Sequence, residues 1–118
     1  MNINIDFKKK NNFQKRLEES KNIIHKYPDR IPIIVEKLKD SKLNNIDKSK
    51  YLVPKDMTIG QFIYIIRKRI HLESNQALFC FINNQLPPSN ALLSNIYNDF
   101  QDEDGFLYIT YTNENTFG

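Results

Sequence analysis

The sequence predicts an α+β fold, because segments typical of strands alternate with segments typical of amphipathic helices. Short runs of alternating or continuous apolar residues indicate strands, and apolar residues at a spacing of three and four indicate helices. In chain order the expected core is strand 31–37, strand 48–53, helix 59–70, strand 78–82, helix 92–100 and strand 106–111. One further helix, from 13 to 26, precedes these elements, and the segment 2–10 is either a short helix or a mobile arm.

Composition places the chain among single-domain globular proteins. It has 118 residues, of which 40% are hydrophobic and 26% charged. The longest apolar run, ALFCFI, has too few residues to span a bilayer, and no secretory signal pattern opens the sequence. The single cysteine, Cys80, excludes an internal disulfide and suits a reducing compartment such as the cytosol or nucleus.

Charge is distributed unevenly along the chain. Residues 1–50 contain 13 Lys and Arg against 7 Asp and Glu, a balance of +6, whereas residues 51–118 contain 4 against 7, a balance of −3. A basic half favours acidic peptides, anionic lipid surfaces or nucleic acid, or is simply a solvated surface. The segment FCFIN lacks the Lys/Arg-Gly-aromatic pattern of RNA-binding strands, so no nucleic-acid partner is expected.

The first helix and strand have recognisable ends. Asn11 or Asn12 is the expected N-cap of the helix, and Tyr27 before Pro28 ends it near position 26. Its expected apolar face comprises Phe13, Leu17, Ile23 and Ile24. The strand 31–37 is apolar on both faces, which predicts that both faces are covered.

The segment from 48 to 70 predicts a strand, a tight connection and a helix with a wide apolar surface. Pro54 ends the strand, and Thr58 with Gln61 forms a capping box that starts the helix at Ile59. Ile59, Ile63, Ile66 and Ile70 fall on one core-facing stripe, with Phe62, Ile65 and Arg69 on a second stripe beside it. That second stripe is either half-buried core or a lipophilic pocket beside a strand that could accept a partner.

The remaining elements complete a β-grasp arrangement. The continuous apolar segment 78–82 predicts a central strand, Asn83-Asn84 a turn, and Ser89 or Asn90 the cap of the last helix. The acidic residues 102–104 predict a solvated turn, and the tail from Thr112 is expected to be mobile. The order of two helices followed by ββαβαβ is that of a β-grasp with right-handed crossovers.

No pattern of residues predicts catalysis, a metal or a cofactor. His25 and His71 lie far apart, one cysteine gives no metal-ligand spacing, and three glycines form no phosphate-binding loop. Cys80 lies in an apolar strand, where burial raises a thiol pKa, so a packed thiol is expected rather than a nucleophile. The chain is therefore predicted not to be an enzyme.

Several motifs together resemble the autophagy ubiquitin-like modifiers, the family of GABA-receptor-associated protein and microtubule-associated light chain three, and are nearer to the former. They are YPDRIP (27–32), VEK (35–37), KYLVP (50–54), GQF (60–62), IRKRI (66–70), NN (83–84), PP (87–88), DEDGFLY (102–108) and FG (117–118). The resemblance runs from about Phe13 to the last residue. It implies a ubiquitin-like β-grasp (30–111) with two additional N-terminal helices (1–27) and a flexible tail (112–118), all within one domain.

The resemblance also implies a function. Gly118 would be activated, passed between enzyme cysteines and joined to phosphatidylethanolamine on autophagosomal or vesicle membranes. Implied partners are activating and conjugating enzymes, a processing and deconjugating cysteine protease, and cargo receptors carrying aromatic-x-x-aliphatic motifs. The protein would be cytoplasmic until it is lipidated. Relatives extend past this glycine, so a chain ending at Gly118 is expected to be either made mature or truncated.

The resemblance assigns residues to two peptide-binding pockets. The aromatic pocket would be lined by Glu19, Ile23, Pro32, Lys50, Leu52 and Phe106. The aliphatic pocket would be lined by Tyr51, Val53, Pro54, Met57, Phe62 and Ile65, with Lys48 and Arg69 meeting acidic residues of the ligand. Two alternatives remain open: an unconjugated β-grasp adaptor of vesicle trafficking that only binds peptides, and a thiol enzyme that uses Cys80.

Overall fold

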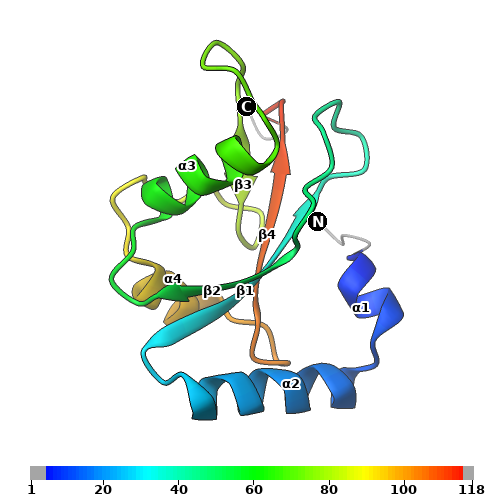
Figure 1. The fold of residues 1–118 in the computed structure, drawn as a ribbon, viewed down its shortest axis with the longest axis vertical. Coiled ribbons are helices and arrows are strands. Elements are labelled where there is room, and N and C mark those ends of the chain that lie inside the picture. The colour runs from blue at the N-terminus through cyan, green and yellow to red at the C-terminus, as the bar shows by residue number, and fades with distance from the viewer. Residues whose placement is uncertain (1–4, 116–118) are drawn as a thin grey trace.

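The computed structural model describes residues 5–115 and contains one four-stranded sheet and four helices in that range. The elements are α1 (Asp6–Lys10), α2 (Phe13–Lys26), β1 (Arg30–Lys37), β2 (Lys50–Pro54), α3 (Ile59–Arg69), β3 (Phe79–Phe81), α4 (Leu93–Phe100) and β4 (Leu107–Thr112). The strand order is β2-β1-β4-β3, with β1 and β4 parallel and the two outer pairs antiparallel (Figure 1). The predicted element order is confirmed, and the segment 2–10 contains the short helix α1.

The sheet separates two hydrophobic cores. Alternate residues of β1 point to opposite faces, so Ile31, Ile33 and Val35 join the larger core under α3 and α4, and Ile34 joins the smaller one under α1 and α2 (Figure 1). All four side chains are buried, which confirms that β1 is covered on both faces. The middle of the strand on which the sheet is assembled, residues 31–35, is therefore shielded from water, whereas Arg30 at its start is exposed.

Helix α3 begins where the capping box predicts. The Gln61 N–H donates to Thr58 Oγ1 at 3.1 Å, and the Thr58 N–H donates to Gln61 Oε1 at 2.9 Å. Phe62 of the second stripe is 0% exposed, as Ile59 and Ile66 of the first stripe are, whereas Ile65 is half-buried and Arg69 is exposed. Phe62 is thus more deeply buried than either sequence-based alternative required.

Two sequence predictions about the second half of the chain are wrong. Segment 78–82 contains an edge strand, β3, rather than a central one. Its apolar character reflects burial of Cys80, Phe81 and Ile82 by covering side chains, not strand pairing on both sides. Helix α4 has no side-chain cap from Ser89 or Asn90, because these two residues form a turn that the Ala91 N–H closes by donating to Pro88 O at 2.9 Å, and Leu92 takes the N-cap position.

Two further predictions are corrected at the ends of elements. Pro54 is the last residue of β2 rather than the residue after it, which its place on the sheet edge permits. Thr112 belongs to β4 and is 4% exposed, so the predicted tail begins one residue later. The rest of that predicted tail reaches residues 116–118, which lie outside the described range.

Helix α2 is held to the sheet by a buried polar cluster rather than by its apolar residues alone. Phe13 and Ile24, predicted to face the core, are 43% and 36% exposed, whereas Arg16 and Ser20 are buried. Arg16 Nε donates to Asp104 Oδ2 at 2.9 Å, and Ser20 Oγ donates to the Asp104 carbonyl. The cap prediction holds, since Asn12 Oδ1 accepts the Lys15 N–H at 2.9 Å.

Asp104 is the centre of this cluster and contradicts the predicted solvated turn. Its side chain is 0% exposed and also accepts bonds from Tyr108 Oη at 2.5 Å and the Phe106 N–H at 2.9 Å. Burial raises the pKa of the Asp104 carboxyl above its usual range, and burial with the neighbouring carboxylate raises that of Tyr108. The buried Asp104 carboxyl is tolerated because its hydrogen bonds to Arg16, Tyr108 and the Phe106 N–H replace the hydrogen bonds to water that it loses on burial.

Replacing this carboxylate should therefore destabilise the fold. In Asp104→Asn the buried Arg16 loses its counter-charge, and we expect the free energy of unfolding to fall by about 3 kcal/mol in a urea titration. The control is Asp6→Asn, since Asp6 pairs with Lys39 at 3.2 Å while 55% of its side chain is exposed; that change should cost much less, because an exposed ion pair adds little to stability. Equal costs for the two variants would contradict a central role for Asp104.

Candidate functional site

Strand β2 forms one edge of the sheet and places side chains on both of its faces. β2 pairs only with β1 within the described residues, which leaves the outer row of backbone N–H and C=O groups of β2 without a strand partner. Tyr51 and Val53 are buried toward α3, whereas Lys50 and Leu52 lie on the α2 side, with Lys50 exposed and Leu52 half-buried. An edge of this kind is open to pairing with an added strand.

The residues assigned to the aromatic pocket are brought together on the α2 side of this edge. Pro32 lies directly opposite Leu52 in the β1–β2 register, and Ile23 of α2 packs against the cluster that contains Phe106. Lys50 Nζ lies 2.7 Å from Glu19 Oε2, so an ion pair connects β2 with α2. An incoming side chain at this position would meet apolar walls beneath a polar rim.

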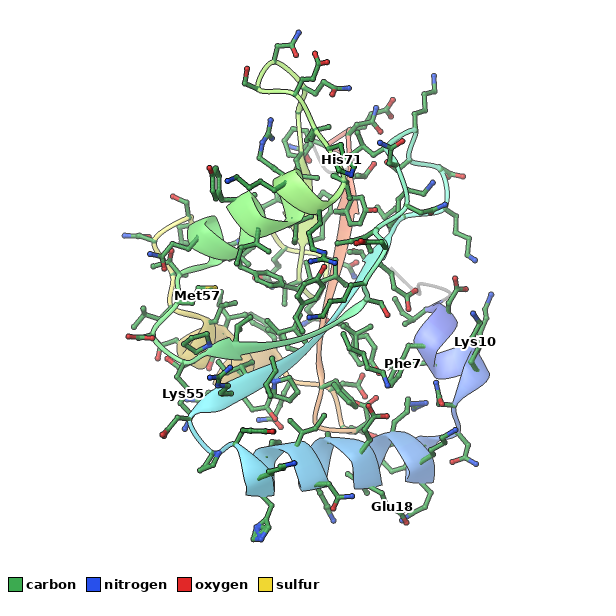
Figure 2. The ribbon with its side chains drawn as sticks, viewed as in Figure 1. Phe7, Lys10, Glu18, Lys55, Met57 and His71 are labelled. Carbon is green, nitrogen blue, oxygen red and sulfur yellow. The ribbon has the colours of Figure 1, made fainter. Side chains whose placement is uncertain are left out.

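Phe7 is a member of this site that the sequence analysis missed. It lies on α1 and points toward the sheet (Figure 2), where its ring packs edge-on against Phe106 with the ring centroids 5.3 Å apart. Lys50 Nζ lies 5.2 Å from the centroid of the Phe7 ring. The backbone N–H of Asp6 and that of Phe7 donate to the Glu36 carboxylate at 2.8 and 2.9 Å, which docks α1. The signal in the sequence was the alternation of three apolar residues, Ile3, Ile5 and Phe7, in an otherwise polar segment.

The residues assigned to the aliphatic pocket lie on the α3 side and are tightly packed. The rings of Tyr51 and Phe62 meet edge-on with centroids 5.3 Å apart, and Val53 is buried beside them in the same core. Met57 and Ile65 are half-buried against that core, whereas Pro54 is exposed and is not part of it. The Tyr51 hydroxyl is buried and has no hydrogen-bond partner within residues 5–115. This side of the edge is an apolar floor with one unused donor.

The two cations assigned to ligand acids already interact with groups of the chain. Lys48 Nζ lies 5.1 Å from the centroid of the Tyr51 ring. Arg69 forms two parallel bonds with Asp47, from Nε to Oδ1 and from Nη2 to Oδ2, both at 3.1 Å. The hydrogen bond from Arg69 holds the pKa of the Asp47 carboxyl below its usual value. A ligand acid must therefore either replace Asp47 or bind the N–H groups of Arg69 that Asp47 leaves free.

Other chemistry finds little support in the described part of the chain. Residues 5–115 contain no group of three His, Cys, Asp or Glu placed to hold a metal ion, and no helix long and apolar enough to cross a bilayer. Cys80 is 3% exposed, and burial raises the pKa of its thiol to about 12. Gly118, the residue assigned to conjugation, lies outside the described residues.

Comparisons with known proteins identify the family of this chain. The family model described as "Autophagy protein Atg8 ubiquitin like" matches residues 15–118. The chain belongs to the Atg8 family. It is 58% identical to autophagy-related protein 8e of Arabidopsis thaliana, covering 100% of this chain and 97% of that protein. It is 56% identical to autophagy-related protein 8 of Neosartorya fischeri, covering 95% of each.

A solved structure gives the same result for the fold. The crystal structure of Trypanosoma brucei ATG8 superposes with a TM-score of 0.89 at 42% identity, covering 98% of this chain and 99% of that one. The predicted ubiquitin-like fold is thereby confirmed, and so is the predicted family; the nearer branch within the family stays a prediction. As an Atg8 protein the chain is a ubiquitin-like modifier of autophagy, a class that works with conjugation machinery and cargo adaptors rather than by catalysis.

The buried thiol provides a direct test of the thiol-enzyme alternative. At pH 8 a thiol with a pKa of about 12 has far less thiolate than an unfolded cysteine, so Cys80 in the folded chain should react with iodoacetamide about a thousandfold more slowly than in denaturant. Mass spectrometry of the alkylated peptide measures both rates. Rapid alkylation of the folded chain would show a reactive, accessible thiol and would revive that alternative.

Proposed function

We propose that this Atg8 protein is conjugated through Gly118 to phosphatidylethanolamine and recruits cargo receptors and adaptors that carry aromatic-x-x-aliphatic motifs. The observation that carries the proposal is the open edge of β2, with an apolar site on each side of it. A peptide added as a further strand would gain backbone hydrogen bonds along that edge. Its alternate side chains would then point to the α2 side and the α3 side in turn.

The roles of the two sides follow from their packing. The α2 side has a polar rim, and Lys50 and Glu19, whose side chains are 52% and 29% exposed, would have to separate before an aromatic ring reaches Leu52 and Ile23. The α3 side would take the smaller aliphatic residue above Val53 and Ile65. Filling both sites, in addition to the backbone bonds, is consistent with affinities around micromolar, about −8 kcal/mol.

Conjugation through Gly118 has its own physical argument. Glycine lacks a Cβ, which lets the terminal carbonyl come close to an attacking sulfur or amine in a narrow enzyme channel. A two-chain lipid then holds the protein on a membrane more firmly than one acyl chain can. The partners would be activating and conjugating enzymes and a processing cysteine protease, and the lipidated form would reside on autophagosomal membranes. We propose that the whole chain takes part in conjugation and peptide binding as one domain.

Deletion of Gly118 tests conjugation. With activating enzyme, conjugating enzyme, ATP and phosphatidylethanolamine liposomes, the wild-type chain should gain one lipid by mass spectrometry and float with the liposomes. The deleted chain should do neither, while its peptide affinity and melting curve stay unchanged. Lipid attachment to the deleted chain, or none to the wild type, would refute conjugation and leave the unconjugated adaptor.

The Asp47–Arg69 pair tests the charged end of the groove. Asp47→Asn frees Arg69, so a peptide with an acidic residue placed near Arg69 should bind about threefold more tightly. Arg69→Gln should weaken the same peptide by a similar factor. Isothermal titration calorimetry measures the affinities. The control is a matched peptide with glutamine in place of the acidic residue, and both variants should bind this peptide as tightly as the wild-type chain does. Unchanged affinity of Asp47→Asn for the acidic peptide would mean that Arg69 does not meet the ligand.

A further inference from the structure

A cavity of about 560 Å³ lies between α1, the C-terminal end of β1 and the loop from 38 to 49. Its volume is within the range of about 300–1,000 Å³ that is typical of small-ligand sites. Lysines from three separate segments line it, namely Lys10 of α1, Lys37 of β1 and Lys39 of the loop. None of the residues assigned to the two peptide pockets lines this cavity.

The groups in the cavity that remain available are mainly hydrogen-bond donors. Its two carboxylates are occupied, because Glu36 accepts the two backbone N–H groups of α1 and Asp6 accepts from Lys39 Nζ at 3.2 Å. The side chains of Lys10, Lys37, Asn45 and Ser49 form no hydrogen bond or ion pair within residues 5–115. Lys37 is half-buried, whereas Lys10 and Lys39 are exposed. The lining carries three lysines against two carboxylates, a balance of +1, and its unpaired donors suit an oxyanion.

The cavity also lies at the end of the sheet from which the chain continues to Gly118. Lys37 is opposite Tyr111 in the parallel β1–β4 register, and the Leu38 N–H donates to Tyr111 O at 2.9 Å. β4 ends at Thr112, and six residues lead from there to Gly118. Six residues span at most about 20 Å. A lipid joined to Gly118 would therefore keep this end of the sheet close to the membrane surface.

We propose that this cavity binds the phosphate monoester of an anionic lipid headgroup in the membrane to which the C-terminus is attached. The proposal rests on the proposed function only for that attachment. A phosphate monoester carries nearly two negative charges at neutral pH and three acceptor oxygens, which suits the free ammonium, amide and hydroxyl donors. The screening length of about 8 Å at physiological ionic strength limits such contacts to a surface held nearby, as the short C-terminal connection would ensure.

The test attaches the chain to vesicles without the conjugation enzymes, so that a failure of conjugation does not affect it. A cysteine appended after Gly118 couples to a maleimide lipid, and Cys80 does not compete because it is 3% exposed. The vesicles contain phosphatidylcholine with either phosphatidylinositol 4-phosphate or phosphatidylserine at matched surface charge. Each lysine is then acetylated chemically, and mass spectrometry measures how much slower its acetylation is on the vesicles than in solution. This slowing is the protection of that lysine.

The expected result is protection of Lys10 and Lys37 by about fivefold on the phosphoinositide vesicles and much less on the phosphatidylserine vesicles. Lys37→Gln should abolish the protection of Lys10. The matched control Lys42→Gln, in an exposed lysine of the same loop that does not line the cavity, should preserve it.

Three results would overturn the proposal. Equal protection on both kinds of vesicle would reduce it to diffuse charge attraction. Protection by soluble inositol 1,4-bisphosphate without protection on vesicles would assign the cavity to a free phosphate rather than to a lipid. No protection under any condition would remove the site. Both variants should melt as the wild-type chain does, so that a change in lysine protection cannot be caused by a change in folding.

Discussion

The burial of residues 31–35 of β1 on both faces of the sheet is the constraint on which the rest of the molecule depends. β1 has a strand on each side and a hydrophobic core on each face, so its position determines where every other element lies. One neighbour, β4, is itself paired on both sides, whereas the other, β2, ends the sheet. The stability of the fold is thus concentrated at the centre, which allows β2 to keep its outer edge unpaired without threatening the fold.

The open edge works as a recognition surface because the two faces beside it are built differently. Toward α3 the floor is packed as densely as the core, with Tyr51 and Phe62 in edge-on contact. Toward α2 the surface is held by polar contacts, among them Lys50 with Glu19 and, further along α2, Arg16 with the buried Asp104. The buried cluster fixes the position of α2, so the ion pair at the rim can open without displacing the helix.

Sequence reasoning succeeded where a local signal determines local structure. The Thr58–Gln61 capping box, the Asn12 cap, the Asn83-Asn84 turn with φ of 50° and 64°, and the two-sided burial of β1 each follow from a few neighbouring residues. The failures involve contacts distant in sequence. The ion pair from Arg16 to Asp104 spans 88 positions, and no local pattern distinguishes a buried aspartate from the acidic turn around it. The edge position of β3 likewise depends on strand order, which its apolar residues do not specify.

Helix α1 shows how such distant contacts connect separate parts of the surface. A helix of five residues is too short to be stable alone, so its structure depends on docking. The docking contacts are the Glu36 carboxylate at its N-terminus, Phe7 against Phe106, and the ion pair of Lys8 with Asp102. Phe7 also lines the lysine cavity on one side and lies under Lys50 at the groove on the other. Both surfaces therefore depend on the same few contacts, and any displacement of α1 would change the wall of each.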